Sequence, residues 1–401
     1  MTDPLVPVPP AVPDPDALAR LIAALDGPAD GVRYIGGWVR DTLLGLAPQD
    51  IDVATRFPPE EVERRARTAG LDTWNSVSGI AHGTIGVLVG GRSLEVTTLR
   101  RDVATDGRHA TVAFTDDWRE DAARRDFTIN ALSADPLTGA VHDYFGGLDD
   151  LAAGRVRFIG EPLQRIAEDH LRILRFFRFH ARFGRGALDG PSYAACVERA
   201  RDLMALSRER IAAELLKLLA VADPVATVRA MLEGGLFAPM LPEIVEAGRL
   251  EALVQAEAAA EIAPDGLRRL AALLPASPAV AEQVAARLRL SKADRRRLAL
   301  AADGERPAYP EALAYALGAE TAIDRLLLAG ETEAAQALRG WQRPPFPLSG
   351  GALIALGLAP GPVVAATLQA VERRWVEAGF PDEATLQDFA RTAVREALGA
   401  R

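Results

Sequence analysis

Hydrophobic and polar residues follow different patterns in the two parts of the chain, and the first pattern predicts short β-strands. Apolar residues alternate with polar ones, or form short apolar runs, at residues 34–35, 50–53, 84–89, 94–99, 112–114 and 141–144. Gly90 and Gly91 separate two of these runs, and a two-residue glycine loop is typical of a β-hairpin. Apolar residues at helical spacing predict helices between the strands at residues 17–25, 62–69 and 121–131.

From Asp149 to the end of the chain, the pattern predicts helices alone. Residues 161–183 are expected to form one long helix or two in close succession. Ser207 and Ser291 are suitable N-caps for helices at residues 207–220 and 292–301. Prolines in residues 343–347 predict a link to a last helical segment at residues 348–380. The expected fold class is therefore α+β, with a mixed head followed by an all-helical arm.

The expected divisions of the chain are a disordered lead-in (residues 1–16), a head (17–148), a helical neck (149–220), a helical body (221–342) and a helical tail (343–401). A chain of 401 residues exceeds a single hydrophobic core, so several domains are expected. The lead-in is rich in proline and lacks the basic start and apolar run of a signal peptide. Because no apolar stretch is long enough to span a bilayer, a cytoplasmic location is expected.

The net charge of −9 argues against a nucleic-acid partner, but basic residues are concentrated in the middle of the chain. Between Leu151 and Arg210 there are twelve arginines and seven acids, a local excess of five positive charges. The single cysteine, Cys196, excludes an intramolecular disulfide and a cysteine-based metal site. No histidine follows His180, so a phosphohydrolase domain with a His-Asp metal site is not expected in the second half.

The strongest chemical pattern lies where the first strand ends. Gly36 and Gly37 precede a helix, so their backbone N–H groups can bind a phosphate, and Arg40 lies one turn into that helix. Asp50 and Asp52 are two residues apart in the next strand, which places both carboxylates on one face. Carboxylate oxygens at such a place suit magnesium and a polyphosphate. Taken alone, each pattern is more often a tight turn or a pair of solvated acids.

Two further groups of residues could belong to the same site. Glu95 lies on the strand face opposite the apolar residues of its strand, which makes it a third metal ligand or an exposed acid. Arg124, Arg125 and Asp126 are expected at the start of a helix. An arginine fork suits phosphate oxygens and an aspartate suits a ribose hydroxyl, whereas the alternative is a surface ion pair.

Asp169 and Arg172 are one helical turn apart and are expected on the same face of a helix. They offer an acceptor beside a donor fork, which is complementary to cytosine and to adenine. Uracil and guanine present a carbonyl where the carboxylate needs a donor, so the pair would select C and A over U and G. A basic stripe, which can contact phosphate or be solvated, continues at Arg175, Arg178, Arg182 and Arg185.

Together these motifs resemble those of class II tRNA nucleotidyltransferases (CCA-adding enzymes) and bacterial poly(A) polymerases. The resemblance covers residues 34–220 by motif and continues more weakly through the helical arm. Its motifs are Gly-Gly-x-Val-Arg-Asp at residues 36–41, Asp50-x-Asp52, residues 124–131, Asp143 with Gly146-Gly147, Glu168-Asp169-x-x-Arg172 and Ser207-x-Glu209-Arg210. It implies a polymerase-β-like nucleotidyltransferase head followed by a helical neck, body and tail.

The resemblance also implies roles for individual residues. Asp50 and Asp52 would hold two Mg²⁺ ions for catalysis. The substrate CTP or ATP would be bound by Gly36, Gly37, Arg40 and Arg125 at the triphosphate, by Asp126 at the ribose 2′-hydroxyl, and by Asp169, Arg172, Arg175 and Arg178 at the base. Asp106, Gly107 and Arg108 would belong to a flexible loop that switches addition from C to A. Gly146 and Gly147 resemble the hinge of such enzymes.

The implied reaction is template-independent addition or repair of the 3′-terminal CCA of tRNA from CTP and ATP, with release of pyrophosphate. The arm would bind the acceptor end and elbow of tRNA by shape and phosphate, with no membrane or DNA partner expected. The same motifs fit a poly(A) polymerase or an enzyme restricted to adding CC or A. A non-catalytic RNA-binding protein is a third hypothesis, but binding alone does not require the paired Asp50 and Asp52.

Overall fold

The computed structural model describes residues 4–8, 10, 12–48, 50–75, 83–105, 110–304 and 309–399. The chain divides into two compact units, Met1–Ser207 with Gly234–Met240 and Arg208–Glu233 with Leu241–Arg401. This division differs from the expected one, because most of the residues expected to form the neck belong to the first unit. The expected loop residues Asp106, Gly107 and Arg108 lie outside the described residues.

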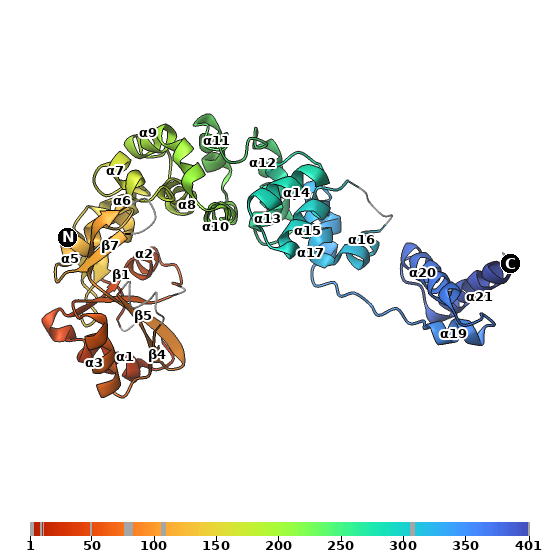
Figure 1. Cartoon of the computed structure of the whole chain (residues 1–401), viewed down its shortest axis with the longest axis horizontal. Helices are drawn as coiled ribbons and strands as arrows, with labels where there is room; N and C mark the ends of the chain where they lie inside the picture. The colour runs from red at the N-terminus through yellow and green to blue at the C-terminus, as the bar shows by residue number, and fades with distance from the viewer. Residues whose placement is uncertain are drawn as a thin grey trace. The chain divides into compact units, whose positions relative to one another are not determined.

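The first unit is built on a seven-stranded sheet with the strand order β3-β4-β5-β2-β1-β8-β9. Figure 1 labels β1, β4 and β5 of this sheet. Its strands are β1 (Val32–Ile35), β2 (Asp52–Thr55), β3 (Thr73–Trp74), β4 (Thr84–Val89), β5 (Arg92–Thr98), β8 (Ser133–Ala134) and β9 (Val141–His142). β2 and β5 run parallel, and the other neighbouring strands run antiparallel. β6 (Arg100–Thr105) and β7 (Ala110–Phe114) form a separate two-stranded sheet.

Burial along the strands explains why the hydrophobic pattern located most of this sheet. β1 is buried at all of its positions, whereas β5 alternates, with Leu94 and Val96 buried and Glu95 exposed between them. Gly90 (φ 57°) and Gly91 (φ 81°) join β4 to β5. Positive φ at both loop residues is the requirement of a type I′ turn, so the predicted hairpin is confirmed.

Helices cover the sheet and continue beyond it (Figure 1). They are α1 (Pro15–Ala24), α2 (Gly37–Leu43), α3 (Pro59–Thr68), α5 (Trp118–Ala123), α6 (Gly147–Ala153), α7 (Pro162–Glu168), α8 (Arg172–Phe183) and α9 (Gly190–Glu198), with 3₁₀ turns η1 (Gly27–Ala29), η2 (Thr128–Asn130) and η3 (Ala200–Ala205). Phe176 of α8 packs against Phe158, with ring centroids 5.8 Å apart, and Phe158 packs against Phe127 at 5.0 Å. This aromatic core joins α8 to the segment between α5 and η2.

The structure differs from the sequence predictions for the first unit in several places. The lead-in packs on the head where it is described, because Val6 is buried and its N–H donates to the carbonyl of Gly139 at 2.9 Å. The helix predicted at residues 121–131 ends at Ala123, and the segment after it buries Asp126 and Asn130. Strand β6 was not predicted. Of the two alternatives for residues 161–183, the structure has two helices, α7 and α8.

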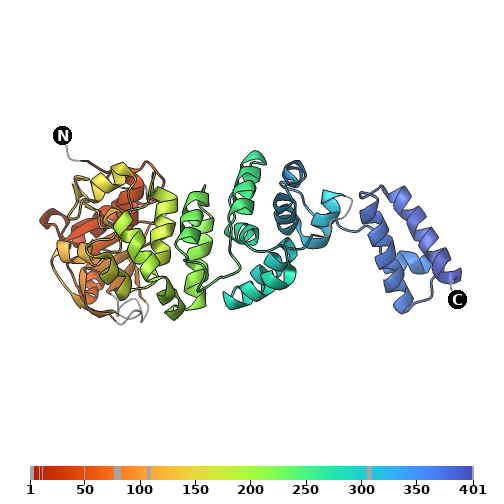
Figure 2. The same cartoon turned by 90° about the horizontal axis from the view of Figure 1, so that it is seen from above.

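The described residues of the second unit form helices joined by loops, with no strand among them (Figure 2). Its helices are α10 (Arg208–Leu219), α11 (Val225–Glu233), α12 (Gly248–Ala259), α13 (Gly266–Leu273), α14 (Pro278–Arg287), α15 (Lys292–Ala301), α16 (Pro310–Leu317), α17 (Ala319–Leu328), α18 (Thr332–Ala337), α19 (Gly350–Ala355), α20 (Pro362–Glu377) and α21 (Glu383–Gly399). Ser291 caps α15 by accepting from the N–H of Asp294, as predicted. None of the described helices is both long and apolar enough to cross a membrane.

The last three helices share a hydrophobic core with one residue of α16. Trp375 and Leu353 lie in this core, and Tyr315 of α16 belongs to it with its ring centroid 6.0 Å from that of Trp375. The Tyr315 hydroxyl donates to Glu372 at 2.6 Å, and the guanidinium of Arg343 lies 4.0 Å from the centre of the Tyr315 ring. The expected boundary at residues 342–343 therefore has body and tail contacts across it.

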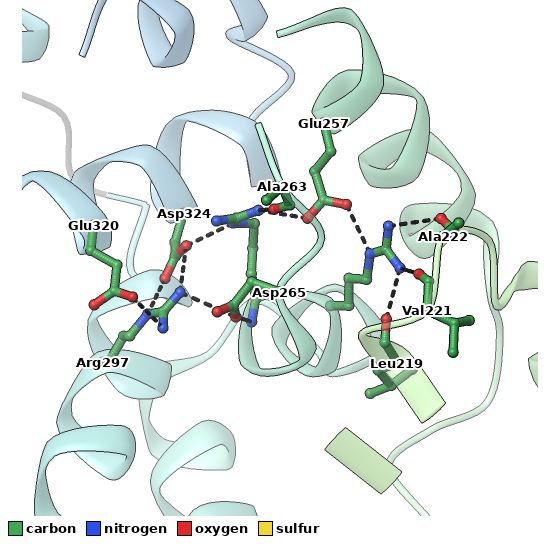
Figure 3. Close-up of polar contacts among 11 residues, drawn as sticks. Leu219, Val221, Ala222, Glu257, Ala263, Asp265, Arg297, Glu320 and Asp324 are labelled. Atoms are coloured by element: carbon green, nitrogen blue, oxygen red, sulfur yellow. Dashed lines mark hydrogen bonds and ion pairs between the residues drawn. The ribbon is translucent and has the colours of Figure 1, made fainter. Parts of the chain in front are cut away.

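A network of buried charges connects helices α12, α13, α15 and α17 (Figure 3). Asp324, which is 1% exposed, accepts from Arg268 at 2.7 Å and from Arg297 at 2.6 Å. Glu257 accepts from Arg268 at 2.6 Å and from Arg269 at 2.8 Å. Burial disfavours the charged form of Arg268, but the attraction of Asp324 and Glu257 raises its pKa. The network is therefore stable only when all of its charges are compensated.

We predict that Asp324→Asn lowers the free energy of unfolding by about 3 to 5 kcal/mol, because it leaves the buried guanidinium of Arg268 and the half-buried one of Arg297 without their shared carboxylate. Urea unfolding followed by far-ultraviolet circular dichroism measures this change. The control is Glu251→Gln, which removes the exposed ion pair to Arg229 and should cost less than about 1 kcal/mol. Equal losses in both variants would contradict the prediction.

Candidate active site

The glycine turn after β1 is built as the sequence predicts, with one correction. Gly36 has φ 63° and ψ −123°, a conformation that favours glycine, and α2 begins at Gly37. The N–H of Gly36 donates to the carbonyl of Leu132 at 3.0 Å, so it is not free to bind a phosphate as predicted. A Cβ atom at Gly36 would lie 2.9 Å from Nη1 of Arg125, and one at Gly37 would lie 3.7 Å from Nη2 of Arg40. Two guanidinium groups therefore meet at this turn.

Arg40, one turn into α2 as predicted, is buried. Its Nε donates to Asp41 at 2.8 Å and its Nη1 donates to Oδ1 of Asn130 at 2.5 Å. The guanidinium lies 4.2 Å from the ring centre of Phe183 on α8. Burial lowers the pKa of Arg40, and Asp41 opposes that effect. Nη2, the atom beside Gly37, also pairs with Asp41 at 2.6 Å, so these contacts fix the guanidinium next to the glycine turn.

Asp52 of β2 and Glu95 of β5 lie on neighbouring parallel strands, whereas Asp50, which was predicted in the same strand as Asp52, precedes β2, because that strand begins at Asp52. Asp52 pairs in register with Glu95, so the two side chains share a face of the sheet, and Asp50 lies two residues before Asp52. The pKa of Asp52 is raised by burial, with Arg125 acting against the shift and Glu95 and Asp50 adding to it. Carboxylates whose charges oppose each other in this way suit a divalent cation. Asp50 and Asp52 therefore fit the magnesium site that the sequence predicts.

Glu95 is not supported as a third metal ligand. Among the described residues, no group of three or more His, Cys, Asp or Glu side chains is placed to hold a metal ion. Further along the same face, Ala54 and Leu99 are covered by Trp118, so the acids occupy one end of the face and a small core the other. Leu99 is buried in this small core.

The arginine pair before Asp126 lies at the end of α5 and not at the start of a helix. Both Arg124 and Arg125 form ion pairs with Asp121, at 2.9 Å and 3.2 Å. Burial disfavours the charged form of Asp121, but the two arginines lower its pKa overall. Arg125 also donates to the backbone carbonyl of Asn130, which directs its guanidinium towards the glycine turn.

Asp126 is buried and accepts four hydrogen bonds from protein groups. Its Oδ2 accepts from Arg175 Nε at 2.8 Å and Nη2 at 2.5 Å, and its Oδ1 accepts from Asn130 Nδ2 at 2.8 Å and from the N–H of Phe127 at 2.9 Å. Burial disfavours its ionisation, yet Arg175 and Asn130 lower its pKa below the ordinary value. Arg175, which was expected to assist base recognition, instead binds this carboxylate.

Asp169 and Arg172 are not on one face of a continuous helix, so the geometry predicted for them is wrong. α7 ends at Glu168, and Asp169 has extended backbone dihedral angles (φ −152°, ψ 107°). Its carboxylate accepts from the N–H of Leu171, and α8 begins at Arg172. Arg172 donates to Glu168 at 2.5 Å and to the carbonyl of Arg124 at 3.2 Å. Both side chains are half-buried at the break between the helices.

The basic stripe of α8 contacts the head at several points. Arg178 lies over the ring of Phe179 at 4.4 Å, and Arg182 pairs with Asp41 at 3.4 Å. Arg185 donates to the carbonyls of Leu151 and Ala152. Part of the stripe is thus occupied by contacts within the first unit.

The expected hinge is a capped turn. The carboxylate of Asp143 accepts from the N–H groups of Phe145, Gly147 and Leu148 at 2.9–3.1 Å. Gly146 has φ 76°, which favours glycine, and a Cβ at Gly147 would meet the carbonyl of Thr128 at 2.3 Å. The glycines are therefore required by the turn and by its close approach to η2.

Sequence reasoning missed Asn130, whose side chain bonds both Arg40 and Asp126. The expected helix hid it, because an asparagine on a solvated helical face would have no such role. It also missed Glu168, which pairs with Arg165 and Arg172 at 2.5 Å. A signal for both was the charged residues close to them in the sequence. Asn130 follows the charged residues 124–126, and Glu168 lies between Arg165 and Arg172.

Comparisons with known proteins find relatives for most of the chain. A family model described as "Poly A polymerase head domain" matches residues 32–157, and one described as "Probable RNA and SrmB- binding site of polymerase A" matches residues 188–247. The chain is 35% identical over 366 residues to "CCA tRNA nucleotidyltransferase 1, mitochondrial" of Mus musculus, with 87% of this chain and 83% of that protein covered. It is 35% identical over 226 residues to "Poly(A) polymerase I" of Haemophilus influenzae, with 52% of this chain and 48% of that protein covered.

A solved structure with the same fold is that of the Bacillus stearothermophilus CCA-adding enzyme in complex with CTP. The TM-score is 0.70 at 27% sequence identity, and the match covers 95% of this chain and 99% of that one. The α+β class predicted from the sequence is confirmed by this likeness and by the mixed sheet of the head.

We predict that Gly36→Ala displaces Arg125 and costs about 1 to 3 kcal/mol of unfolding free energy, since its Cβ would meet that guanidinium in a strained backbone conformation. Binding of inorganic tripolyphosphate should weaken as well. Gly45→Ala is the control, because Gly45 also has positive φ (68°) but nothing within 4 Å of its added Cβ. Calorimetry and urea unfolding measure both effects, and unchanged tripolyphosphate binding in Gly36→Ala would contradict the assignment of the turn.

Proposed function

Since the chain belongs to the family of CCA tRNA nucleotidyltransferases and poly(A) polymerases, we propose that it adds or repairs the 3′-terminal CCA of tRNA from CTP and ATP. The observation that carries the proposal is the position of Arg125. Its guanidinium lies at the Gly36 turn and is also close enough to Asp52 to oppose the rise in the pKa of that carboxylate. A triphosphate at the turn would therefore lie beside the metal-binding acids.

The residues of the head would bind and orient the triphosphate. Arg125 and Arg40 would donate to its oxygens, and the N–H of Gly37 at the start of α2 would do the same. Asp50 and Asp52 would hold two Mg²⁺ ions, which when bound supply the charge that activates the RNA 3′-hydroxyl and stabilises the departing pyrophosphate. Arg40 is held in place by its ion pair with Asp41, so little ordering of this side chain is required when the substrate binds.

Base selection would take place at the break between α7 and α8. Asp169 would accept from the amino group of cytosine or adenine, and Arg172 would donate to the ring nitrogen beside it. The contacts of Arg172 with Glu168 and with backbone carbonyls fix its guanidinium and leave N–H groups for a base. Because the break is held by side chains of the protein, the choice of C and A would need no nucleic-acid template.

The nearest alternative is the same chemistry with another product, such as a poly(A) tail or addition restricted to CC or A. The match to the poly(A) polymerase covers about half of that protein, whereas the match to the CCA tRNA nucleotidyltransferase covers 83% of it, which favours CCA addition. The tRNA would be bound through the arginines of residues 151–210 and the helical second unit. A cytoplasmic location stays a prediction, because the mouse relative carries a mitochondrial name.

The proposal is tested with a tRNA that lacks its 3′ CCA, Mg²⁺, and labelled CTP and ATP supplied singly and together. We expect two C additions, then one A, then a stop, with UTP and GTP rejected. A long A tail without use of CTP would assign the protein as a poly(A) polymerase. Retained tRNA binding without incorporation would support a non-catalytic RNA-binding protein.

We predict that Asp52→Ala lowers the rate of incorporation by at least about a thousandfold while tRNA binding is retained, because one metal-holding carboxylate is lost. Asp72→Ala, at an exposed acid before β3, is the matched control and should keep the wild-type rate. Incorporation kinetics and a filter-binding assay measure the two quantities. An active Asp52→Ala variant would refute the metal assignment.

A further inference from the structure

The carboxylate of Asp126 has no acceptor position left for a ribose hydroxyl in this structure. A carboxylate accepts roughly four hydrogen bonds. Oδ1 accepts from the N–H of Phe127 and from Asn130 Nδ2, and Oδ2 accepts from Nε and Nη2 of Arg175. If Asp126 reads the ribose, the 2′-hydroxyl must replace one of these donors.

Asn130 is the donor that can leave at the lowest cost. The Phe127 N–H belongs to the backbone, and the two bonds from Arg175 join a charged donor to the charged carboxylate, which makes them the stronger ones. The Asn130 amide is neutral, and it is held from its other end by Arg40, whose Nη1 donates to Asn130 Oδ1 at 2.5 Å. Arg40 is the same side chain that lies beside Gly37.

The four side chains Arg40, Asn130, Asp126 and Arg175 thus form one chain of hydrogen bonds from the glycine turn to α8. Asn130 is 7% exposed, and Asp126 is 8% exposed. In such a buried chain, a change at one end alters the hydrogen bonds at the other, because each group has few alternative partners.

We propose that Asn130 is a positioning residue that makes recognition of the ribose 2′-hydroxyl depend on the triphosphate. The inference rests on the proposed function, which assigns the triphosphate to Arg40 and the ribose to Asp126. When a phosphate oxygen takes the Nη1–H group of Arg40, whose Nε and Nη2 stay paired with Asp41, the amide of Asn130 loses the contact that holds it against Asp126. Oδ1 of Asp126 then becomes available to the 2′-hydroxyl.

The wild-type protein tests this coupling directly. The full chain is titrated in a calorimeter with CTP, dCTP, CMP and dCMP, each with Mg²⁺. Each pair of ribo- and deoxyribonucleotides has the same number of phosphates, so the ratio of affinities within a pair measures selectivity for the ribose alone. The ratio of affinities for CTP over dCTP should exceed the ratio for CMP over dCMP by about tenfold, the weight of one hydrogen bond to a charged group. Equal ratios would overturn the proposal.

Two variants test whether Asn130 carries the coupling. Asn130→Ala removes both of its bonds, and Asn130→Leu removes both while it keeps most of the side-chain volume. In each variant Oδ1 is available without a triphosphate, so the two selectivity ratios should become equal. If the two ratios still differ in either folded variant by as much as they do in the wild type, the assignment is overturned.

The matched control is Thr128→Val in the same η2 turn. Thr128 is fully buried and its hydroxyl donates to Asp150 at 2.6 Å, away from the chain of bonds. This variant should lose stability, as the Asn130 variants do, but keep the wild-type difference between the ratios. Equal ratios in Thr128→Val would mean that Asn130 acts through stability alone. Because the titrations need no tRNA, they are separate from the incorporation assay, whose failure would reject the proposed function itself.

Discussion

The buried carboxylate of Asp126 is the interaction on which the arrangement of the first unit depends. A carboxylate that is 8% exposed stays charged only if donors surround it, and here the donors come from α8, η2 and the backbone of Phe127. Satisfying that charge therefore fixes α8 against the segment after α5. The aromatic core of Phe127, Phe158 and Phe176 completes the same contact on its apolar side.

Most of the sheet could be predicted from the sequence, because alternating apolar and polar residues indicate strands and turn residues indicate where they end. Gly90 and Gly91 indicated the hairpin, and the apolar run before Gly36 indicated strand β1. The helix boundaries near the site could not be predicted in the same way. Residues 124–131 have no proline or glycine that would end a helix, and the helix ends there because Asp126 and Asn130 find buried partners far away in the sequence.

The residues of the site were easier to predict than their geometry. The glycine turn, Arg40, Arg125 and the Asp50–Asp52 pair are local features whose spacing reflects their chemistry, and the structure brings them together. The partners of Arg172 and Arg175 depend on tertiary contacts across 48 and 49 residues of chain. The break at Asp169 likewise depends on its own side chain bonding the backbone ahead of it, a competition that spacing alone does not reveal.

The position of Tyr315 has a practical consequence for dissecting the arm. Its ring belongs to the core of the last three helices, although the residue itself is in α16. A chain that ends before residue 343 would leave the Tyr315 ring without Trp375 and Phe380. A chain that begins at residue 343 would have a cavity in its core at the position of that ring. Fragments meant to separate the two segments should therefore keep α16 with the C-terminal piece, or replace Tyr315 by a polar residue in the N-terminal one.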